Sequence, residues 1–252
     1  MIHYHGTPIT PNTAALAAIG GGHAFVSFSR PDQIGLALDC CQSFAVDNGA
    51  FSAWRTGKPI TEWARYYLWV ADLHRCPTFD FAVIPDVIDG DEQANDKLLA
   101  EWPWQSAKDK GVGAPVWHMH ESVDRLVRLA TEWPRVCLGS SGEFSVIGDS
   151  RWWGRMGEAM NAVCDKQGLP ICKLHGLRML DTDVFSRLPF SSADSTNVAQ
   201  SVGIDSRWSG AYSPSSKDVR ATVLRTRIEA FQSAPEWGKV AVQESMFDEV
   251  AA

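Results

Sequence analysis

Residues 43–51 have the sequence Ser-Phe-Ala-Val-Asp-Asn-Gly-Ala-Phe, a short apolar run that ends on a carboxylate. Similar runs recur along the chain, and nearly every one ends on, or is followed by, a residue that can take part in chemistry. The eight runs cover residues 2–5, 24–28, 43–47, 81–85, 113–117, 135–138, 170–174 and 189–193. In a barrel of alternating strands and helices, the carboxyl ends of all strands meet on one face, where the active site lies. The runs therefore predict an α/β fold, a single (β/α)8 TIM barrel, with these residues around one pocket.

Helical patterns fill intervals between these runs. Apolar residues recur at helical spacing in residues 61–70, 91–110, 121–132 and 150–167. The second of these segments should kink or break at Pro103, because proline cannot donate the helical hydrogen bond. A loop rich in Ser, Gly and Pro at about 201–216 is expected over the barrel mouth, followed by a last helix at about 217–232. We expect residues 1–252 to form one barrel domain.

Composition agrees with such a barrel and narrows the function classes. The chain has 252 residues, of which 45% are hydrophobic and 21% charged, the size of one eight-fold barrel. Its net charge of −7 argues against indiscriminate nucleic-acid binding, which needs clustered Lys and Arg. The six cysteines show no paired metal-ligand spacing and are interpreted as reduced core residues. Because no secretory signal or long apolar segment is present, we expect a cytoplasmic protein without a membrane partner.

Five short motifs, in order along the chain, resemble one enzyme family. Residues 47–51 resemble the Asp-Ser-Gly-Gly-Tyr/Phe motif of the tRNA-guanine transglycosylase superfamily, in particular the 7-deazaguanine DNA transglycosylases of phages and bacterial genomic islands. Residues 79–86 are similar to the family strand whose terminal Asp reads the guanine edge, and residues 138–143 to its Gly-Leu-Ala-Val-Gly-Glu loop. Residues 171–176 stand where the family has a strand ending in a Gly-rich turn, and residues 192–197 where it carries its nucleophilic Asp. The resemblance covers about residues 43–200.

This resemblance implies a two-step base exchange in which guanine in DNA is replaced by a 7-deazaguanine base similar to preQ0. Asp194 would attack C1′ of the nucleotide and form a covalent intermediate, and Asp47 would be the second carboxylate, which handles protons. Asp86 would accept hydrogen bonds from the base, and Phe51 would stack on it. The other residues expected to bind substrate are Asn48, Gly49, His118, Gly139, Ser140 and His175.

Departures from the family pattern bear on metal and substrate. No cysteine follows Asp194, so the zinc subdomain of the tRNA-acting relatives is not expected, nor is any other metal or cofactor. His118-Met119-His120 stands where the family has Gln-Gly-Gly, which leaves the base-edge contact at this strand open. Because the sequence is shorter than the family's tRNA-acting members, we expect no C-terminal RNA-binding domain, which favours DNA over tRNA. Contacts to the DNA backbone are expected from Arg30, Arg207, Lys217 and Arg220. A solvated helix face also explains the basic stretch that contains Arg207, Lys217 and Arg220.

Two other function classes remain open alongside a tRNA substrate. His3-Tyr4-His5 places two imidazoles on the same face of the first strand. With His118 or His120, His175 and Asp194, they match the ligand types of metal-dependent amidohydrolase barrels, in which metal-activated water reacts. The third class is a barrel that binds a modified base or nucleic acid without transforming it. A homodimer also stays open, because apolar helix faces serve either a dimer or the packing of the barrel itself.

Overall fold

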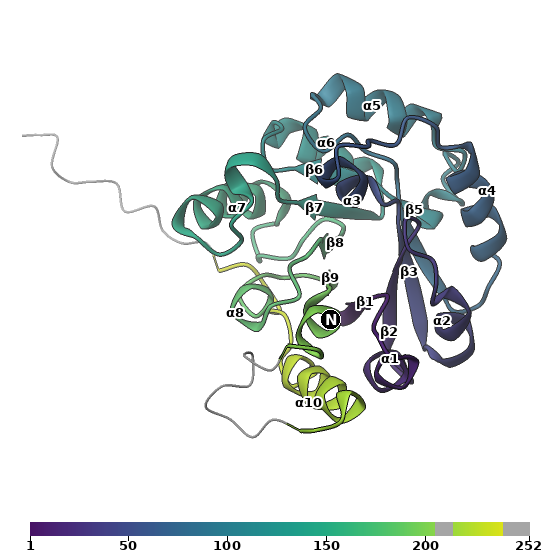
Figure 1. Cartoon of the computed structure of the whole chain (residues 1–252). Helices are drawn as coiled ribbons and strands as arrows, with labels where there is room; N and C mark the ends of the chain where they lie inside the picture. Colours follow the sequence, from purple (N-terminus) through teal and green to yellow (C-terminus); the bar gives the residue numbers. More distant parts are fainter. Residues whose placement is uncertain (205–213, 239–252) are drawn as a thin grey trace, which may run out of the picture.

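The computed structural model describes residues 1–204 and 214–238, which form a sheet of parallel strands surrounded by helices (Figure 1). The strands are β1 (Ile2–Gly6), β2 (His23–Ser27), β3 (Ser43–Asp47), β4 (Phe79–Val83), β5 (Gly113–Ala114), β6 (Val116–His118), β7 (Arg135–Gly139), β8 (Lys173–Gly176) and β9 (Ser192–Ser195). They are hydrogen-bonded in the order β5-β4-β3-β2-β1-β9-β8-β7-β6. Because β5 and β6 are consecutive in the sequence, the two ends of this order meet, and the barrel is nearly closed.

Pro115 divides the strand that the sequence predicts at residues 113–117. The segment before it, β5, pairs with β4, and the segment after it, β6, pairs with β7. Proline has no N–H to donate to a ladder, but its carbonyl still accepts a hydrogen bond of 2.8 Å from the Cys137 amide. The expected α/β barrel is therefore confirmed, whereas the expected count of eight strands becomes nine in the described part of the chain.

Helices lie between most successive strands along the chain, and Figure 1 shows most of them around the outside of the sheet. They are α1 (Asn12–Ile19), α2 (Ile34–Cys40), α3 (Ala50–Arg55), α4 (Ala64–Leu73), α5 (Glu92–Glu101), α6 (Val123–Glu132), α7 (Ser150–Val163), α8 (Thr182–Phe185), α9 (Asn197–Ser201) and α10 (Lys217–Glu229), with short 3₁₀ turns η1 (Lys110–Val112) and η2 (Gly142–Phe144). As expected, the helix of the 91–110 segment ends before Pro103. Helix α10 packs on α1 and so brings the last described helix beside the first. Within residues 1–204 and 214–238, no helix has both the length and the apolar character that crossing a membrane requires.

Side-chain alternation along the strands decides what faces the barrel interior. Phe44 and Val46 of β3 pack outward in the core between strands and helices, whereas Ala45 between them faces inward. The inward cluster contains Tyr4, Phe25, Ala45, Phe81, Val83, Ala114, Val116 and Cys137. By the same alternation, Asp47 lies on the inner side at the carboxyl end of β3.

A polar network fills the amino-terminal part of the barrel interior. The Tyr4 hydroxyl donates a 2.5 Å hydrogen bond to Asp80, and Arg135 forms an ion pair of 3.0 Å with the same carboxylate. Burial raises the pKa of Tyr4, so its phenol keeps the proton that it donates. The Arg135 guanidinium lies 4.1 Å from the centroid of the Phe81 ring. With this end filled, the open part of the interior lies toward the carboxyl ends of the strands.

Candidate active site

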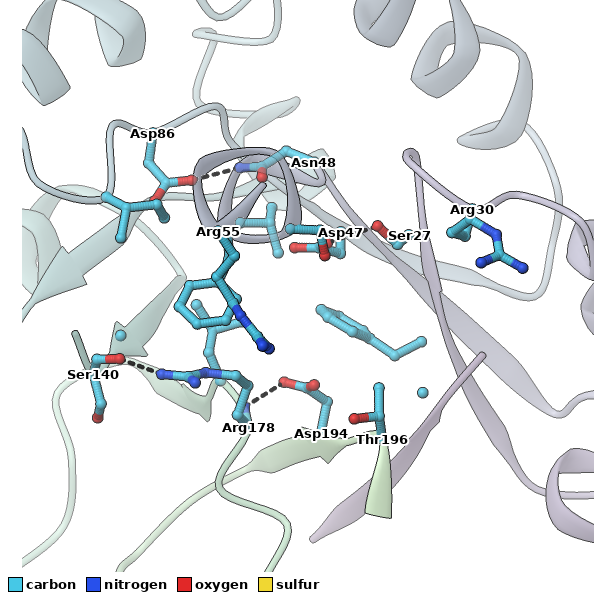
Figure 2. Close-up of a pocket in the computed structure, with 18 of the residues that line it drawn as sticks. Ser27, Arg30, Asp47, Asn48, Arg55, Asp86, Ser140, Arg178, Asp194 and Thr196 are labelled. Atoms are coloured by element: carbon cyan, nitrogen blue, oxygen red, sulfur yellow. Dashed lines mark hydrogen bonds between the residues drawn. The ribbon is translucent and has the colours of Figure 1, made fainter. Parts of the chain in front are cut away.

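A cavity of about 370 Å³ opens at the carboxyl ends of the strands, a volume within the range of small-molecule sites. Three carboxylates line it: Asp47 at the end of β3, Asp86 in the loop after β4, and Asp194 in β9. Figure 2 shows Asp47 and Asp194 on different sides of the cavity, with their carboxylates directed into it. Barrel closure thus brings together residues that are far apart in the sequence, as the strand-end pattern predicts.

Asp47 is partly buried and has two hydrogen-bond donors. Its Oδ2 accepts hydrogen bonds from the Ser27 hydroxyl at 2.9 Å and from the Gly49 amide at 3.0 Å. Burial raises the pKa of Asp47 to about 7. The negative charges of Asp194 and Asp86 also raise this pKa, whereas the two hydrogen-bond donors lower it. A carboxyl group with this pKa can both give and take a proton near neutral pH.

Gly49 shapes the turn that follows Asp47. Its φ is +83°, in the left-handed region that favours glycine. A Cβ at this position would clash with the Ser29 hydroxyl oxygen. Gly49 itself does not line the cavity, and its close approach is to Ser29.

Asn48, Asp86 and His118 form a buried hydrogen-bonded group in the cavity wall. The Asn48 amide donates to Oδ1 of Asp86 at 2.7 Å and to the Ile84 carbonyl at 2.9 Å. His118 Nε2 lies 2.8 Å from Oδ2 of Asp86. Gly139 leaves room for this imidazole, since a Cβ there would lie 3.1 Å from His118 Nδ1. The carboxylate of Asp86 is thereby held in place and keeps unused lone pairs for a ligand that donates N–H groups.

Asp194 has a hydrogen-bond partner in His175, a residue that the sequence analysis predicts in the substrate pocket. His175 is fully buried and does not line the cavity, so the structure places it behind the pocket wall. Its Nδ1 lies 2.8 Å from the Ser192 hydroxyl and its Nε2 lies 3.3 Å from Oδ1 of Asp194. Burial lowers the pKa of His175, so the ring is neutral at pH 7 and donates through Nε2 to Asp194.

Two arginines that the sequence reasoning missed, Arg55 and Arg178, lie beside Phe51 in the cavity. The Arg178 guanidinium lies 4.0 Å from the centroid of the Phe51 ring, and that of Arg55 lies 6.0 Å from it. Arg178 also donates a side-chain hydrogen bond to the Ser140 carbonyl and a backbone hydrogen bond of 3.0 Å to Asp194 (Figure 2). Their positions carried a signal: Arg55 is four residues after Phe51 and so on the same helix face, and Arg178 stands two residues after the end of β8.

The arginines and lysine expected to contact a nucleic-acid backbone are spread over different places. Arg30 lines the cavity and is exposed, with an ion pair of 3.1 Å to Asp32. Lys217 and Arg220 lie at the start of α10 and do not line the cavity. Arg220 donates hydrogen bonds to two backbone carbonyls. Arg207 lies outside the described residues.

The paired histidines of β1 face away from the cavity. His3 Nε2 lies 2.9 Å from the Phe231 carbonyl oxygen, and His5 Nε2 lies 3.1 Å from the Glu229 carboxylate of α10. In the described part of the chain, no group of three or more His, Cys, Asp or Glu residues is arranged to hold a metal ion. The two imidazoles that suggest an amidohydrolase ligand set are therefore structural contacts between β1 and the C-terminal segment.

Comparison of the chain with protein-family models, curated proteins and solved structures finds no match. What the protein does is therefore argued from the chemistry of the cavity. Its main features are two carboxylates on different sides, a fixed carboxylate acceptor in the wall, and an aromatic ring with two guanidinium groups.

Proposed function

We propose that this protein is a base-exchange transglycosylase that replaces guanine in DNA by a 7-deazaguanine base through a covalent aspartyl–deoxyribose intermediate. The observation that carries the proposal is the placement of Asp47 and Asp194 in one cavity, directed into it from different sides. Enzymes that exchange a glycosidic bond in two displacement steps need one carboxylate as nucleophile and another group that moves protons. Asp47 has a raised pKa, and Asp194 is fixed by two hydrogen bonds, so we assign the two carboxylates different roles.

Asp194 is the proposed nucleophile. Its Oδ1 accepts two hydrogen bonds, from the Arg178 amide and from His175, which fix the carboxylate and leave Oδ2 for the reaction. Attack of this oxygen on C1′ forms a carbon–oxygen bond while the bond from C1′ to guanine breaks, and the electron pair leaves with the base. In the second step a ring nitrogen of the incoming 7-deazaguanine attacks C1′ and displaces Asp194.

Asp47 is the proposed proton carrier. With its pKa raised to about 7 by burial, the carboxyl group holds a proton for part of the time at neutral pH. It protonates the departing guanine in the first step and accepts the proton that the incoming base loses in the second. The enzyme then returns to its starting protonation state, so the exchange needs no other proton donor.

Base recognition is assigned to the wall of the cavity. The Asp86 carboxylate, held by Asn48 and His118, can accept hydrogen bonds from the N–H groups on the guanine edge. Phe51 offers a ring face for stacking, and the Ser140 carbonyl is a further acceptor at the cavity. A base inside a duplex would have to leave the stack to reach these groups.

The assignment of the fold as a TIM barrel is part of this proposal. The barrel is taken as a TIM barrel without a zinc subdomain, in which β5 and β6 together form one of eight strand positions. On this view the cavity occupies the face where TIM-barrel enzymes carry their active sites.

The test is incorporation of a labelled base. The purified protein is incubated with DNA and either labelled guanine or a 7-deazaguanine, and the nucleosides of the digested DNA are analysed by mass spectrometry. We expect incorporation by the wild type and loss of at least about 10³-fold in Asp194→Asn. The matched control is Asp183→Asn, which changes an exposed carboxylate of α8 and should leave incorporation unchanged.

Each alternative has its own outcome in this experiment. Incorporation into tRNA but not into DNA would keep the mechanism and overturn the substrate. Undiminished incorporation by a folded Asp194→Asn protein would overturn the mechanism. Stabilisation of the protein by a base without any turnover would favour a binding protein.

A further inference from the structure

Arg55 and Arg178 are brought to one ring from different parts of the chain. Arg55 ends α3, and Arg178 lies in the loop after β8. Both guanidinium groups lie within 6.0 Å of the Phe51 ring centroid. In residues 1–204 and 214–238, neither side chain forms an ion pair with a carboxylate. The two neighbouring cations repel one another. The charge of Asp194 offsets part of this repulsion at Arg178, and an anionic ligand held by both guanidinium groups would relieve the rest.

The electrostatics of the pair agree with this geometry. Burial lowers the pKa of Arg178; the negative charge of Asp194 opposes this shift, and the positive charge of Arg55 adds to it. Arg178 is half-buried, whereas Arg55 is exposed at the rim, so one group lies deeper in the cavity than the other. An anion entering from solvent would meet Arg55 first and then Arg178.

We propose that Arg55 and Arg178 form a phosphate subsite that holds the DNA phosphodiester next to the target guanine. This inference rests on the proposed function, because it takes the target nucleotide to lie between Asp47 and Asp194. The phosphate groups on either side of a nucleotide lie within a few bonds of C1′, and a chain of net charge −7 with three carboxylates in this cavity repels them. Guanidinium groups match phosphate oxygens in pairs of charge-assisted hydrogen bonds and can offset that repulsion.

The subsite also explains how the stacking face of Phe51 becomes free. The Arg178 guanidinium lies 4.0 Å from the centroid of this ring and donates a hydrogen bond to the Ser140 carbonyl. It thus occupies two of the groups assigned to the base. A phosphate would offer Arg178 a charged partner in place of the Phe51 ring and the neutral Ser140 carbonyl. Binding of the phosphate would therefore move the Arg178 side chain off the ring face that the base needs.

The test is a cycle of changes in the protein and in the DNA, read by binding. A fluorescein-labelled single-stranded oligodeoxynucleotide with one guanine is prepared with normal linkages and with a neutral methylphosphonate at the linkage on either side of that guanine. Fluorescence anisotropy gives Kd for the wild type and for the Arg55→Gln/Arg178→Gln variant. The control is Arg75→Gln, an exposed arginine before β4, at the opposite end of the strands.

For the wild type, we expect one methylphosphonate to raise Kd about tenfold, as for the loss of a charge-assisted hydrogen bond. The double variant should raise Kd by a similar factor with normal DNA, and the same methylphosphonate should then add less than about twofold. The slope of log Kd against log salt should fall by about 0.7, the value for one phosphate contact in a single strand. Arg55→Gln alone, at an exposed position, should give part of the effect if the double variant folds poorly.

The subsite would be overturned if the double variant and the methylphosphonate raised Kd by factors that simply multiply. It would also be overturned if the double variant and the Arg75→Gln control had equal effects on Kd. Thermal stabilisation of the wild type by inorganic phosphate, without coupling to the methylphosphonate, would assign the pair to a free anion and also overturn it. The binding cycle requires no turnover, so its failure is distinct from failure of base exchange. Coupling without incorporation would remove the proposed function and leave a site for nucleic-acid phosphate.

Discussion

The raised pKa of Asp47 predicts a specific dependence of stability on pH. The native carboxyl group keeps its proton up to about pH 7, whereas the unfolded one releases it near its ordinary value of 3.8. Between these values the native state binds more protons, so the stabilisation from this group is complete at low pH and is lost as the pH rises toward 7. At about 1.4 kcal/mol per pKa unit, the upper bound of the loss is about 4 kcal/mol. We expect about 2 kcal/mol, because solvent in the cavity screens the charge.

Asp47→Asn removes this dependence, because the amide is neutral at every pH and its oxygen can accept from Ser27 and Gly49 as the carboxylate does. The difference in free energy of unfolding, variant minus wild type, should increase by about 2 kcal/mol as the pH rises from about 4.5 to about 8. Urea denaturation followed by tryptophan fluorescence measures it. The control, Asp183→Asn, changes an exposed carboxylate and should show no such trend. A constant difference between Asp47→Asn and wild type over this range would refute the reasoning, since Asp47 would then ionise as an ordinary carboxylate.

Two further predictions concern the scaffold around the cavity. Gly49→Ala should lower the free energy of unfolding by about 1–3 kcal/mol, because φ is +83° and the new Cβ meets Ser29. The matched control is Gly154→Ala, in an exposed and open position of α7. It should raise the free energy of unfolding by up to about 1 kcal/mol in the same urea titration. Arg125→Met should cost about 3–5 kcal/mol by thermal or urea unfolding, because its ion pair of 2.7 Å with Glu121 is buried and the carboxylate would lose its counter-charge. A loss below about 1 kcal/mol would show that Glu121 takes up a proton or reaches water instead.

Much of the barrel and its three carboxylates follows from the sequence. The segment Ser43–Asp47 was predicted with the bounds that the structure has, because a short apolar run ended by Asp and Gly is a strong local signal. Asp86 and Asp194 were found in the same way, since parallel strands gather their carboxyl ends at one face whatever their separation along the chain. The roles proposed for these carboxylates remain predictions.

Other parts of the site depend on contacts that no local pattern contains. His175 was expected at the substrate, yet alternation and packing place its ring beneath Asp194. His3 and His5 share a strand face, as predicted, but only the assembled barrel decides that this face meets Glu229 of α10 and the Phe231 carbonyl after it. Arg178 reaches Phe51 across the cavity through a long side chain whose direction depends on its neighbours.

The sequence by itself determined where along the chain the strands lie, with bounds that differ from the observed ones by up to three residues, and which polar residues stand near their carboxyl ends. Apolar runs and turn residues act over a few neighbouring positions, which is why this much is local. Only the tertiary structure decided that Pro115 divides a strand between two pairings, which histidines face the interior, and which arginines reach the cavity. The physical reason is that these outcomes depend on barrel closure, on strand register and on the side-chain packing of segments that are remote in the chain.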